Sequence, residues 1–229
     1  MSIPFDINSS SPHDDQRSES QIACLTDLVG SGRVCDLGCG NGRLAIPLAQ
    51  GGAHVVAVDY REEAVRACGI ADDSIQTVLG DMTSLPTALG LFDWVLCVGN
   101  TFGLLNDVDD AVSALQTWRG MLREGGAVVL DDLPGDFWPE VTSGRWANGL
   151  SEDASQQLVW NDRDAVLAFR CGHRVDSDHW SIQTDDVPIR IWTDGALRMA
   201  ARLAGFSPPE VIPDGAILVL RPATNITSH

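Results

Sequence analysis

Between residues 33 and 132, short apolar runs alternate with longer segments whose apolar residues recur at helical spacing. This alternation predicts strands separated by helices in a doubly wound, mostly parallel sheet. Every run ends in polar side chains, and these are Asp36, Asp59, Asp81, Asn100 and the pair Asp131-Asp132. Ligands bind outside the carboxyl ends of the strands in such sheets, so the polar ends predict a binding site at this edge.

The pattern changes after residue 133. A loop rich in Gly, Pro and Trp comes first, and the segment 156–192 then alternates in the manner of an antiparallel meander. A capped helix is expected over 193–206, followed by a hairpin that turns at Asp214-Gly215. A purely parallel repeat would not end in this way.

These observations predict the organisation of the chain. We expect a single α/β, Rossmann-like domain over 1–229, with 133–192 inserted after the fifth strand as an antiparallel β lid on the substrate side. A first helix is expected over 19–30. Residues 1–20 are polar and acidic, and we expect them to form a flexible segment that orders over a ligand.

Charge excludes one class of partner. The chain has 15 basic and 32 acidic residues and a formal net charge of −17, whereas nucleic-acid binding needs a basic surface. All the basic residues are Arg, which also excludes Schiff-base chemistry on lysine. No apolar run approaches the ~18 residues of a membrane span. The N-terminus lacks the regions of a signal peptide, so we expect a cytoplasmic protein without membrane contacts.

The cysteines do not form a metal site in the sequence. All six are scattered, without a CxxC pair or a histidine at ligand spacing, and we expect buried, reduced thiols. Asp131-Asp132 resemble the metal-binding acids of catechol-type O-methyltransferases. That site also needs a carboxylate where this chain has Asn100, so no metal is expected.

The segment DLGCGNG, residues 36–42, places three glycines at alternate positions directly behind the first apolar run. Such a loop lets the backbone approach a nucleotide-bearing cofactor, but its G-x-G-x-G spacing differs from the G-x-G-x-x-G of dinucleotide sites. A carboxylate at Asp36 would stand about 5 Å from a pyrophosphate and repel it. Asp36 therefore favours a cofactor that brings an ammonium group. The alternative is that Asp36 only accepts N–H bonds from the loop.

Five motifs, in this order, resemble those of class I S-adenosylmethionine-dependent methyltransferases. They are VCDLGCGNGR (34–43), VVAVD (55–59), GDM (80–82), FDWVLCVGNTFGLL (92–105) and MLREGGAVVLDD (121–132). The resemblance implies S-adenosyl-L-methionine as the cofactor and a Gly-Gly turn before the fifth strand. It also implies a seven-stranded sheet with an antiparallel last strand, which the terminal helix and hairpin fit.

The resemblance carries over roles for individual residues on the cofactor side. It implies that Asp59 holds the ribose hydroxyls and that Asp81 meets the adenine amino group, with Tyr60 and Met82 against the two faces of the ring. The alternatives are a helix cap for Asp59 and a turn residue for Asp81. The expected cofactor site comprises Asp36, Gly38, Gly40, Gly42, Asp59, Tyr60, Asp81, Met82 and Val98.

Asn100 ends the fourth strand, nearest to the expected position of the methyl group. CVGNTFGLL is close to the C-x-G-N-S-F pattern of N-methyltransferases of the glycine and sarcosine type, which implies a small metabolite as the acceptor. Asn100 would position the nucleophile or hydrogen-bond the loop backbone. Direct in-line displacement onto an N or O nucleophile needs positioning and exclusion of water, and a general base is optional.

Candidate substrate residues are less well defined. His173 alternates with Leu167, Phe169 and Cys171, so it shares their strand face as a packing histidine or as a substrate-facing base. The expected substrate-binding residues are Phe102, Trp138, Trp146, Arg170 and Arg174. The arginines would hold a carboxylate or carry a solvated charge. The tryptophans would form a pocket, hold a cationic amine, or pack the meander onto the sheet.

Two other functions fit parts of the pattern. The first is an NAD(P)-dependent oxidoreductase, because the glycine loop alone is common to both classes. The second is a methyltransferase fold that binds the cofactor without catalysis. The sequence carries no indication of an oligomeric state.

Overall fold

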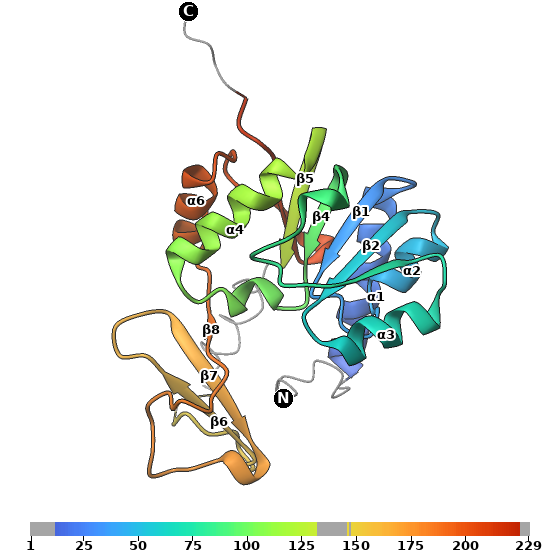
Figure 1. Ribbon diagram of the computed structural model, residues 1–229. Helices are drawn as coiled ribbons and strands as arrows, with labels where there is room; N and C mark the ends of the chain where they lie inside the picture. Colours follow the sequence, from blue (N-terminus) through green and yellow to red (C-terminus); the bar gives the residue numbers. More distant parts are fainter. Residues whose placement is uncertain (1–11, 132–145, 147, 225–229) are drawn as a thin grey trace, which may run out of the picture.

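A seven-stranded sheet between two layers of helices dominates the computed structural model, which describes residues 12–131, 146 and 148–224 (Figure 1). Its strands are β1 (Arg33–Leu37), β2 (His54–Asp59), β3 (Gln76–Leu79), β4 (Phe92–Cys97), β5 (Leu122–Asp131), β9 (Glu210–Ile212) and β10 (Ile217–Leu220). The order is β3-β2-β1-β4-β5-β10-β9. The first five strands pair in parallel, and β10 is antiparallel to both of its neighbours. The expected fold is confirmed.

Helices cover both faces of this sheet. One face packs against α1 (Pro12–Val29), α2 (Ala45–Gln50) and α3 (Glu62–Ala71), and the other against α4 (Val108–Gly120) and α6 (Asp194–Leu203). The inner strands β1, β2, β4, β5 and β10 are buried on both sides because their side chains alternate between the two cores, whereas the edge strands β3 and β9 are partly exposed. Within the described ranges, no helix combines the length and the apolar character that crossing a membrane requires.

Three boundaries differ from those expected. Helix α1 begins at Pro12, so residues 12–20 are helical, and the expectation of a flexible segment there is wrong. A proline at the first helical position followed by acidic residues in the first turn suits a helix start. Helix α3 continues past Gly69 to Ala71. The expected Gly-Gly turn lies inside β5, where Gly126 has no room for a Cβ because Asp93 O would be 2.9 Å away.

A separate three-stranded sheet follows the fifth strand. It consists of β6 (Gln156–Trp160), β7 (Val166–Cys171) and β8 (Ile189–Arg190), all antiparallel, and thus confirms the expected meander. It lies beside the main sheet (Figure 1). Its β8 contacts η2 (Thr101–Leu104), the short 3-10 helix that follows β4. The Arg190 Nε donates to Asn106 O over 2.7 Å, which ties the two sheets together at this point.

The C-terminal elements form as expected. Thr193 caps α6 by accepting a hydrogen bond from the Ala196 amide, and Gly205 follows the helix with a φ of +84°. The turn η4 (Pro213–Gly215) then connects β9 to β10. This hairpin completes the main sheet on the β5 side.

Candidate cofactor site

A pocket of about 1240 Å³ lies at the carboxyl ends of β1, β2, β3 and β4. All nine residues expected to form a cofactor site line it, namely Asp36, Gly38, Gly40, Gly42, Asp59, Tyr60, Asp81, Met82 and Val98. They come from four strands and the loops that follow them. The parallel order of the sheet brings them together, because parallel strands place their carboxyl ends at one edge.

The glycine loop lines this pocket with backbone in the left-handed region, which glycine adopts without strain. Gly38, Gly40 and Gly42 all have positive φ, at +72°, +54° and +91°. The amides of Gly38 and Cys39 both donate to Val58 O, over 2.8 and 3.0 Å, which fastens the loop to β2. A Cβ on Gly38 would come within 2.5 Å of Thr101 Cγ2. The loop therefore approaches the end of β4 more closely than any other residue type allows.

Asp36 is a buried carboxylate with an unused oxygen. Its side chain is 2% exposed, and its Oδ2 has no hydrogen-bond partner. Burial raises the pKa of Asp36 to about 7; the guanidinium of Arg43 and the amide of Ala45 oppose this rise, and Asp59 adds to it. Ala45 is the first residue of α2, so its amide is not one of the loop N–H groups that the alternative supposed, and Oδ2 is left for a cationic ligand.

Asp59 organises the neighbouring strand end. Its Oδ2 accepts from the Gly40 amide over 2.9 Å, and its Oδ1 accepts from the Arg61 amide over 2.9 Å. Arg61 Nε lies 3.3 Å from the same Oδ1. Asp59 does not cap α3, whose capping residue is Arg61. Each carboxylate oxygen can accept more than one bond, so capacity remains for a ligand.

Asp81 lies at the pocket rim, as does Tyr60, which is 60% exposed. The Asp81 Oδ1 accepts from the Thr83 amide and hydroxyl over 2.8 and 2.7 Å, which is the turn role of the alternative. Its Oδ2 makes no hydrogen bond within the described residues. Met82 is half-buried, and its carbonyl accepts from Trp118 Nε1 over 2.8 Å.

Arg43 is a pocket residue that the sequence did not single out. Its Nη1 donates to Ser18 Oγ over 3.1 Å and its Nη2 to Gln21 Oε1 over 2.9 Å, so it fastens α1 to the pocket. Gln21 is buried and donates to Asp131 Oδ1 over 3.1 Å. The partners of Arg43 lie more than 20 residues away in the sequence, so no local spacing predicts them. Its position directly after the third glycine is the one sequence signal that places it at the pocket.

Asn100 borders the pocket without lining it. Its neighbours Gly99 and Thr101 line the pocket, whereas Asn100 lines a second, smaller cavity. Its backbone has a φ of +62°, and its amide donates to Asp131 Oδ2. The Oδ1 of its side chain is buried without a partner. Whether the side chain positions a nucleophile or hydrogen-bonds the loop backbone stays a prediction.

The two arginines expected to hold a substrate are occupied elsewhere. Arg170 is 3% exposed, and its Nε and Nη2 donate to Asp186 over 3.0 and 2.7 Å. Arg174 Nη2 donates to Asp186 over 3.0 Å and to Asp185 over 3.2 Å. The expectation of a free substrate-binding guanidinium is wrong for both, because they neutralise carboxylates in the loop after β7.

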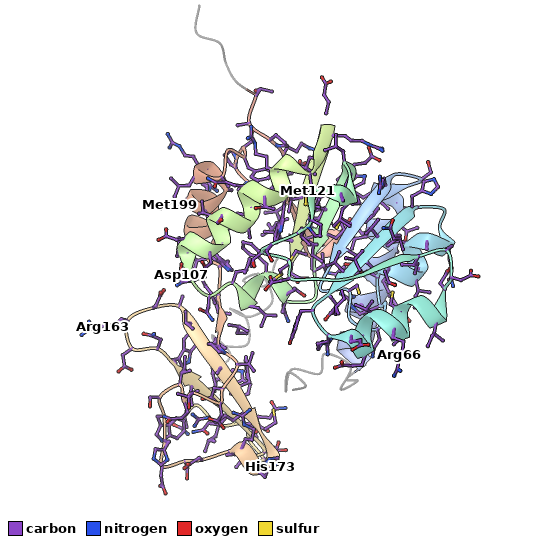
Figure 2. The ribbon with its side chains drawn as sticks, viewed as in Figure 1. Arg66, Asp107, Met121, Arg163, His173 and Met199 are labelled. Atoms are coloured by element: carbon purple, nitrogen blue, oxygen red, sulfur yellow. The ribbon has the colours of Figure 1, made fainter. Side chains whose placement is uncertain are left out.

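His173 and Phe102 also lie elsewhere than expected. Strand β7 ends at Cys171, so His173 falls in the 3-10 turn η3 (Gly172–Arg174), where it is exposed. It lies at the far end of the small sheet (Figure 2). Phe102 is a core residue, with ring centroids 5.9 Å from Trp118 and 5.1 Å from Trp192. His173 therefore does not share the face of β7 as expected, and Phe102 packs in the core beside the smaller cavity that it lines. Roles of the two residues toward a substrate stay predictions.

Trp146 packs on the small sheet. Its ring lies edge-on to that of Phe169, with centroids 5.7 Å apart, beside the cluster of Leu158, Leu167 and Ile191. These contacts lie within the small sheet, so the expected packing of the meander onto the main sheet stays a prediction for Trp146. Trp138 lies outside the described residues. In the parts of the chain that the structure describes, no three His, Cys, Asp or Glu residues gather as a metal site.

The sheet order, the antiparallel last strand and the glycine-loop pocket define a class I S-adenosylmethionine-dependent methyltransferase fold. Residues 34–126 match the family described as a methyltransferase domain. This segment contains the glycine loop and the pocket residues from all four strand ends.

Comparison with known proteins gives the same result. The cypemycin N-terminal methyltransferase of a Streptomyces species is 36% identical over 100 residues, which is 43% of this chain and 40% of that protein. The demethylmenaquinone methyltransferase of Clavibacter sepedonicus is 36% identical over 119 residues, 51% and 47% of the two chains. The chain thus spans less than half the length of these relatives. An S-adenosylmethionine-dependent methyltransferase structure from Clostridium acetobutylicum has a TM-score of 0.64 at 14% identity, over 92% of both chains, and shows the same fold.

Proposed function

We propose that this protein transfers a methyl group from S-adenosyl-L-methionine to a nitrogen or oxygen nucleophile of a small metabolite. One observation carries the proposal. The Oδ2 of Asp36 is a buried acceptor without a partner, in a pocket built on a glycine loop. Such a group is costly to bury unless a ligand satisfies it, and a cation does so best.

The other pocket residues fit this cofactor as well. Asp36 would bind the ammonium of the methionine part, and the positive-φ glycines leave backbone where a side chain would block the ligand. Asp59 would accept from the ribose hydroxyls. Asp81 would accept from the adenine amino group, with Tyr60 and Met82 beside the ring. When bound, S-adenosyl-L-methionine supplies a methyl group that its sulfonium already activates.

The protein's own task is then to bind, orient and exclude water. The segment Gly99–Thr101 borders the pocket at the end of β4 and would face the acceptor. Two observations support a small metabolite as the acceptor. CVGNTFGLL resembles the pattern of N-methyltransferases of the glycine and sarcosine type, and the net charge of −17 disfavours nucleic acid. We also propose that the protein acts in the cytoplasm, because buried cysteines such as Cys35, Cys68 and Cys97 form no disulfide, as in a reducing compartment.

The oxidoreductase alternative meets an obstacle at Asp36. A dinucleotide would bring its pyrophosphate to the glycine loop, next to a buried carboxylate that Asp59 already crowds. The relatives named above are methyltransferases by name, which also favours the proposed cofactor. A fold that binds the cofactor without transfer remains the second alternative, and it makes the same binding predictions.

Calorimetric titration of the purified protein with S-adenosylhomocysteine and, separately, with NADH tests the proposal. We expect S-adenosylhomocysteine to bind and Asp36→Asn to weaken it by about tenfold to a hundredfold, the value of a charge-assisted hydrogen bond. Asp93→Asn is the matched control, because Asp93 lies on the surface, where it pairs with Arg123 over 2.9 Å. Binding of NADH alone would contradict the proposal.

A second experiment separates an enzyme from a cofactor-binding protein. Pools of metabolites are incubated with the protein and a methyl-labelled donor, and transfer is counted. Labelled product that disappears in Asp36→Asn supports the enzyme. Donor binding without transfer to any pool would favour the non-catalytic alternative.

A further inference from the structure

A second cavity of about 20 Å³ lies behind the end of β4, between the main sheet and α6. Asn100 and Asp131 line it on the polar side, and Phe102, Leu130 and Trp192 on the apolar side. Its volume suits a single water-sized group, since one such group needs about 10 to 15 Å³. The question is which group it is built to receive.

Two polar atoms of this cavity's lining residues are buried without a partner. Trp192 is 5% exposed, and its Nε1 donates to no acceptor among the described residues. Asn100 Oδ1 likewise accepts from no donor there. The indole of Trp118 provides the contrast, because it is fully buried and its Nε1 donates to Met82 O over 2.8 Å. Buried polar groups are normally paired, so this donor and this acceptor at one cavity indicate a ligand.

The other polar groups of the cavity are already engaged. Asp131 accepts from Gln21 Nε2 and from the Asn100 amide. Arg190 donates to Asp164 and to Asn106 O. Because these groups already have partners, the indole N–H of Trp192 and the side-chain oxygen of Asn100 remain as the donor and the acceptor that one bound group would bridge.

The Trp192 donor and the Asn100 acceptor together restrict which chemical group can bind in the cavity. An ammonium has no lone pair and cannot accept from the indole. A carboxylate has no proton for Asn100 and would meet the negative charge of Asp131. Aliphatic amines are protonated near neutral pH, with a pKa of about 10. A hydroxyl both accepts and donates through one oxygen, and the cavity has room for that oxygen while the carbon that bears it stays outside.

We propose that this cavity is a binding site for one neutral hydroxyl group, which bridges Trp192 Nε1 and Asn100 Oδ1. Water fills the site in the free protein, and a hydroxyl of the methyl acceptor takes its place in the complex. The second statement rests on the proposed function. It follows from the position of Asn100, whose two chain neighbours line the cofactor pocket.

Indole N–H resonances of the 229-residue chain test the first statement. Each of the seven tryptophans carries one indole N–H, and Trp192→Phe identifies the signal of Trp192. We expect methanol to shift the Trp192 signal and methylammonium, which differs in replacing O–H by NH₃⁺, to leave it unchanged. The Trp118 signal is the internal control, because its N–H is already bonded. Equal shifts with both probes would overturn the assignment of a neutral hydroxyl.

A high-resolution crystal structure with S-adenosylhomocysteine provides the second readout. We expect an oxygen within hydrogen-bond distance of both Trp192 Nε1 and Asn100 Oδ1. A dry cavity, or an indole N–H bonded to a protein carbonyl, would overturn the site. Neither readout needs methyl transfer, and the indole readout needs no S-adenosylhomocysteine, so its failure is distinct from failure of that ligand to bind.

The acceptor statement is tested by kinetics with an acceptor found in the metabolite screen. Trp192→Phe should raise its KM about five- to tenfold, the value of one hydrogen bond, and leave the Kd for S-adenosylhomocysteine unchanged. Trp180→Phe is the matched control, since its Nε1 donates to Ser177 O over 2.7 Å at the surface of the small sheet. An unchanged KM in Trp192→Phe would overturn the acceptor statement.

Discussion

The carboxyl edge of the main sheet and the small three-stranded sheet both bury charged side chains, but they satisfy them differently. Asp36 at the edge keeps one carboxylate oxygen without a partner beside a large pocket. Arg170 in the small sheet uses Nε, Nη1 and Nη2, which donate to Asp186, His179 O and Ser181 O. A buried charge with unused capacity is available to a ligand, whereas a saturated one stabilises the fold.

This difference distinguishes residues that can bind a ligand from residues that stabilise the fold. Gln157 completes the network of the small sheet, because its Nε2 donates to Asp176 O over 2.7 Å and its Oε1 accepts from the Asp176 amide over 2.9 Å. This network fixes the long segment between β7 and β8 without an extensive apolar core. The small sheet can therefore hold its shape on polar bonds, and its arginines are not free for a substrate.

The largest expected effect comes from breaking the buried ion pair of the small sheet. Arg170→Met leaves the Asp186 carboxylate, whose side chain is 0% exposed, without its main partner. We expect a loss of about 3 to 5 kcal/mol in the free energy of unfolding, measured by urea denaturation. Affinity for S-adenosylhomocysteine of the folded variant should not change.

The matched control is Arg123→Met, which removes a surface pair with Asp93 whose side chains are 46% and 35% exposed. It should cost about 1 kcal/mol or less. If Arg170→Met instead weakened ligand binding and left stability intact, Arg170 would belong to the site and the contrast between the two regions would fail.

Gly38→Ala should have a smaller effect than Arg170→Met, and it should act on the affinity for S-adenosylhomocysteine. The new Cβ would lie 2.5 Å from Thr101 Cγ2, and the φ of +72° adds strain of about 1 to 2 kcal/mol. We expect about a hundredfold weaker S-adenosylhomocysteine binding in calorimetry, near 2.7 kcal/mol. Adding Thr101→Ala should restore part of it by removing the clashing methyl group.

Gly120→Ala serves as the control, because a Cβ there meets nothing within 4 Å and the backbone is helical. It should leave binding unchanged. Full affinity in Gly38→Ala would mean that the close approach of the loop to η2 has no role in holding the ligand.

Sequence patterns were sufficient where local chain geometry determines position. Strand ends and a glycine loop are local features, and parallel pairing brings Asp36, Asp59 and Asp81 to one pocket. The partners of Arg170 and Arg43 lie in other elements, so no spacing could identify them. His173 was misplaced because β7 ends at Cys171, two residues before it, and the alternating pattern stops there.

The smallest effect concerns pH and isolates Asp36. Burial raises the pKa of its carboxyl to about 7 from the usual 3.8. Below that pH the group is neutral and must lose a proton to bind an ammonium, so affinity for S-adenosylhomocysteine should be about tenfold weaker at pH 6 than at pH 8. Calorimetry across this range measures the change, and Asp36→Asn should remove it.

The stability of the ligand-free protein should change in the opposite direction, which distinguishes this effect from general acid unfolding. Because the folded pKa of Asp36 lies above its unfolded value of 3.8, the folded state binds the extra proton between these values. The contribution of Asp36 to stability is therefore complete below about pH 4 and is lost as pH rises towards about 7. Comparing urea midpoints of the wild type and Asp36→Asn across this range isolates the contribution. A ligand affinity that stays flat from pH 6 to pH 8 would mean that Asp36 does not carry the cationic end of the ligand.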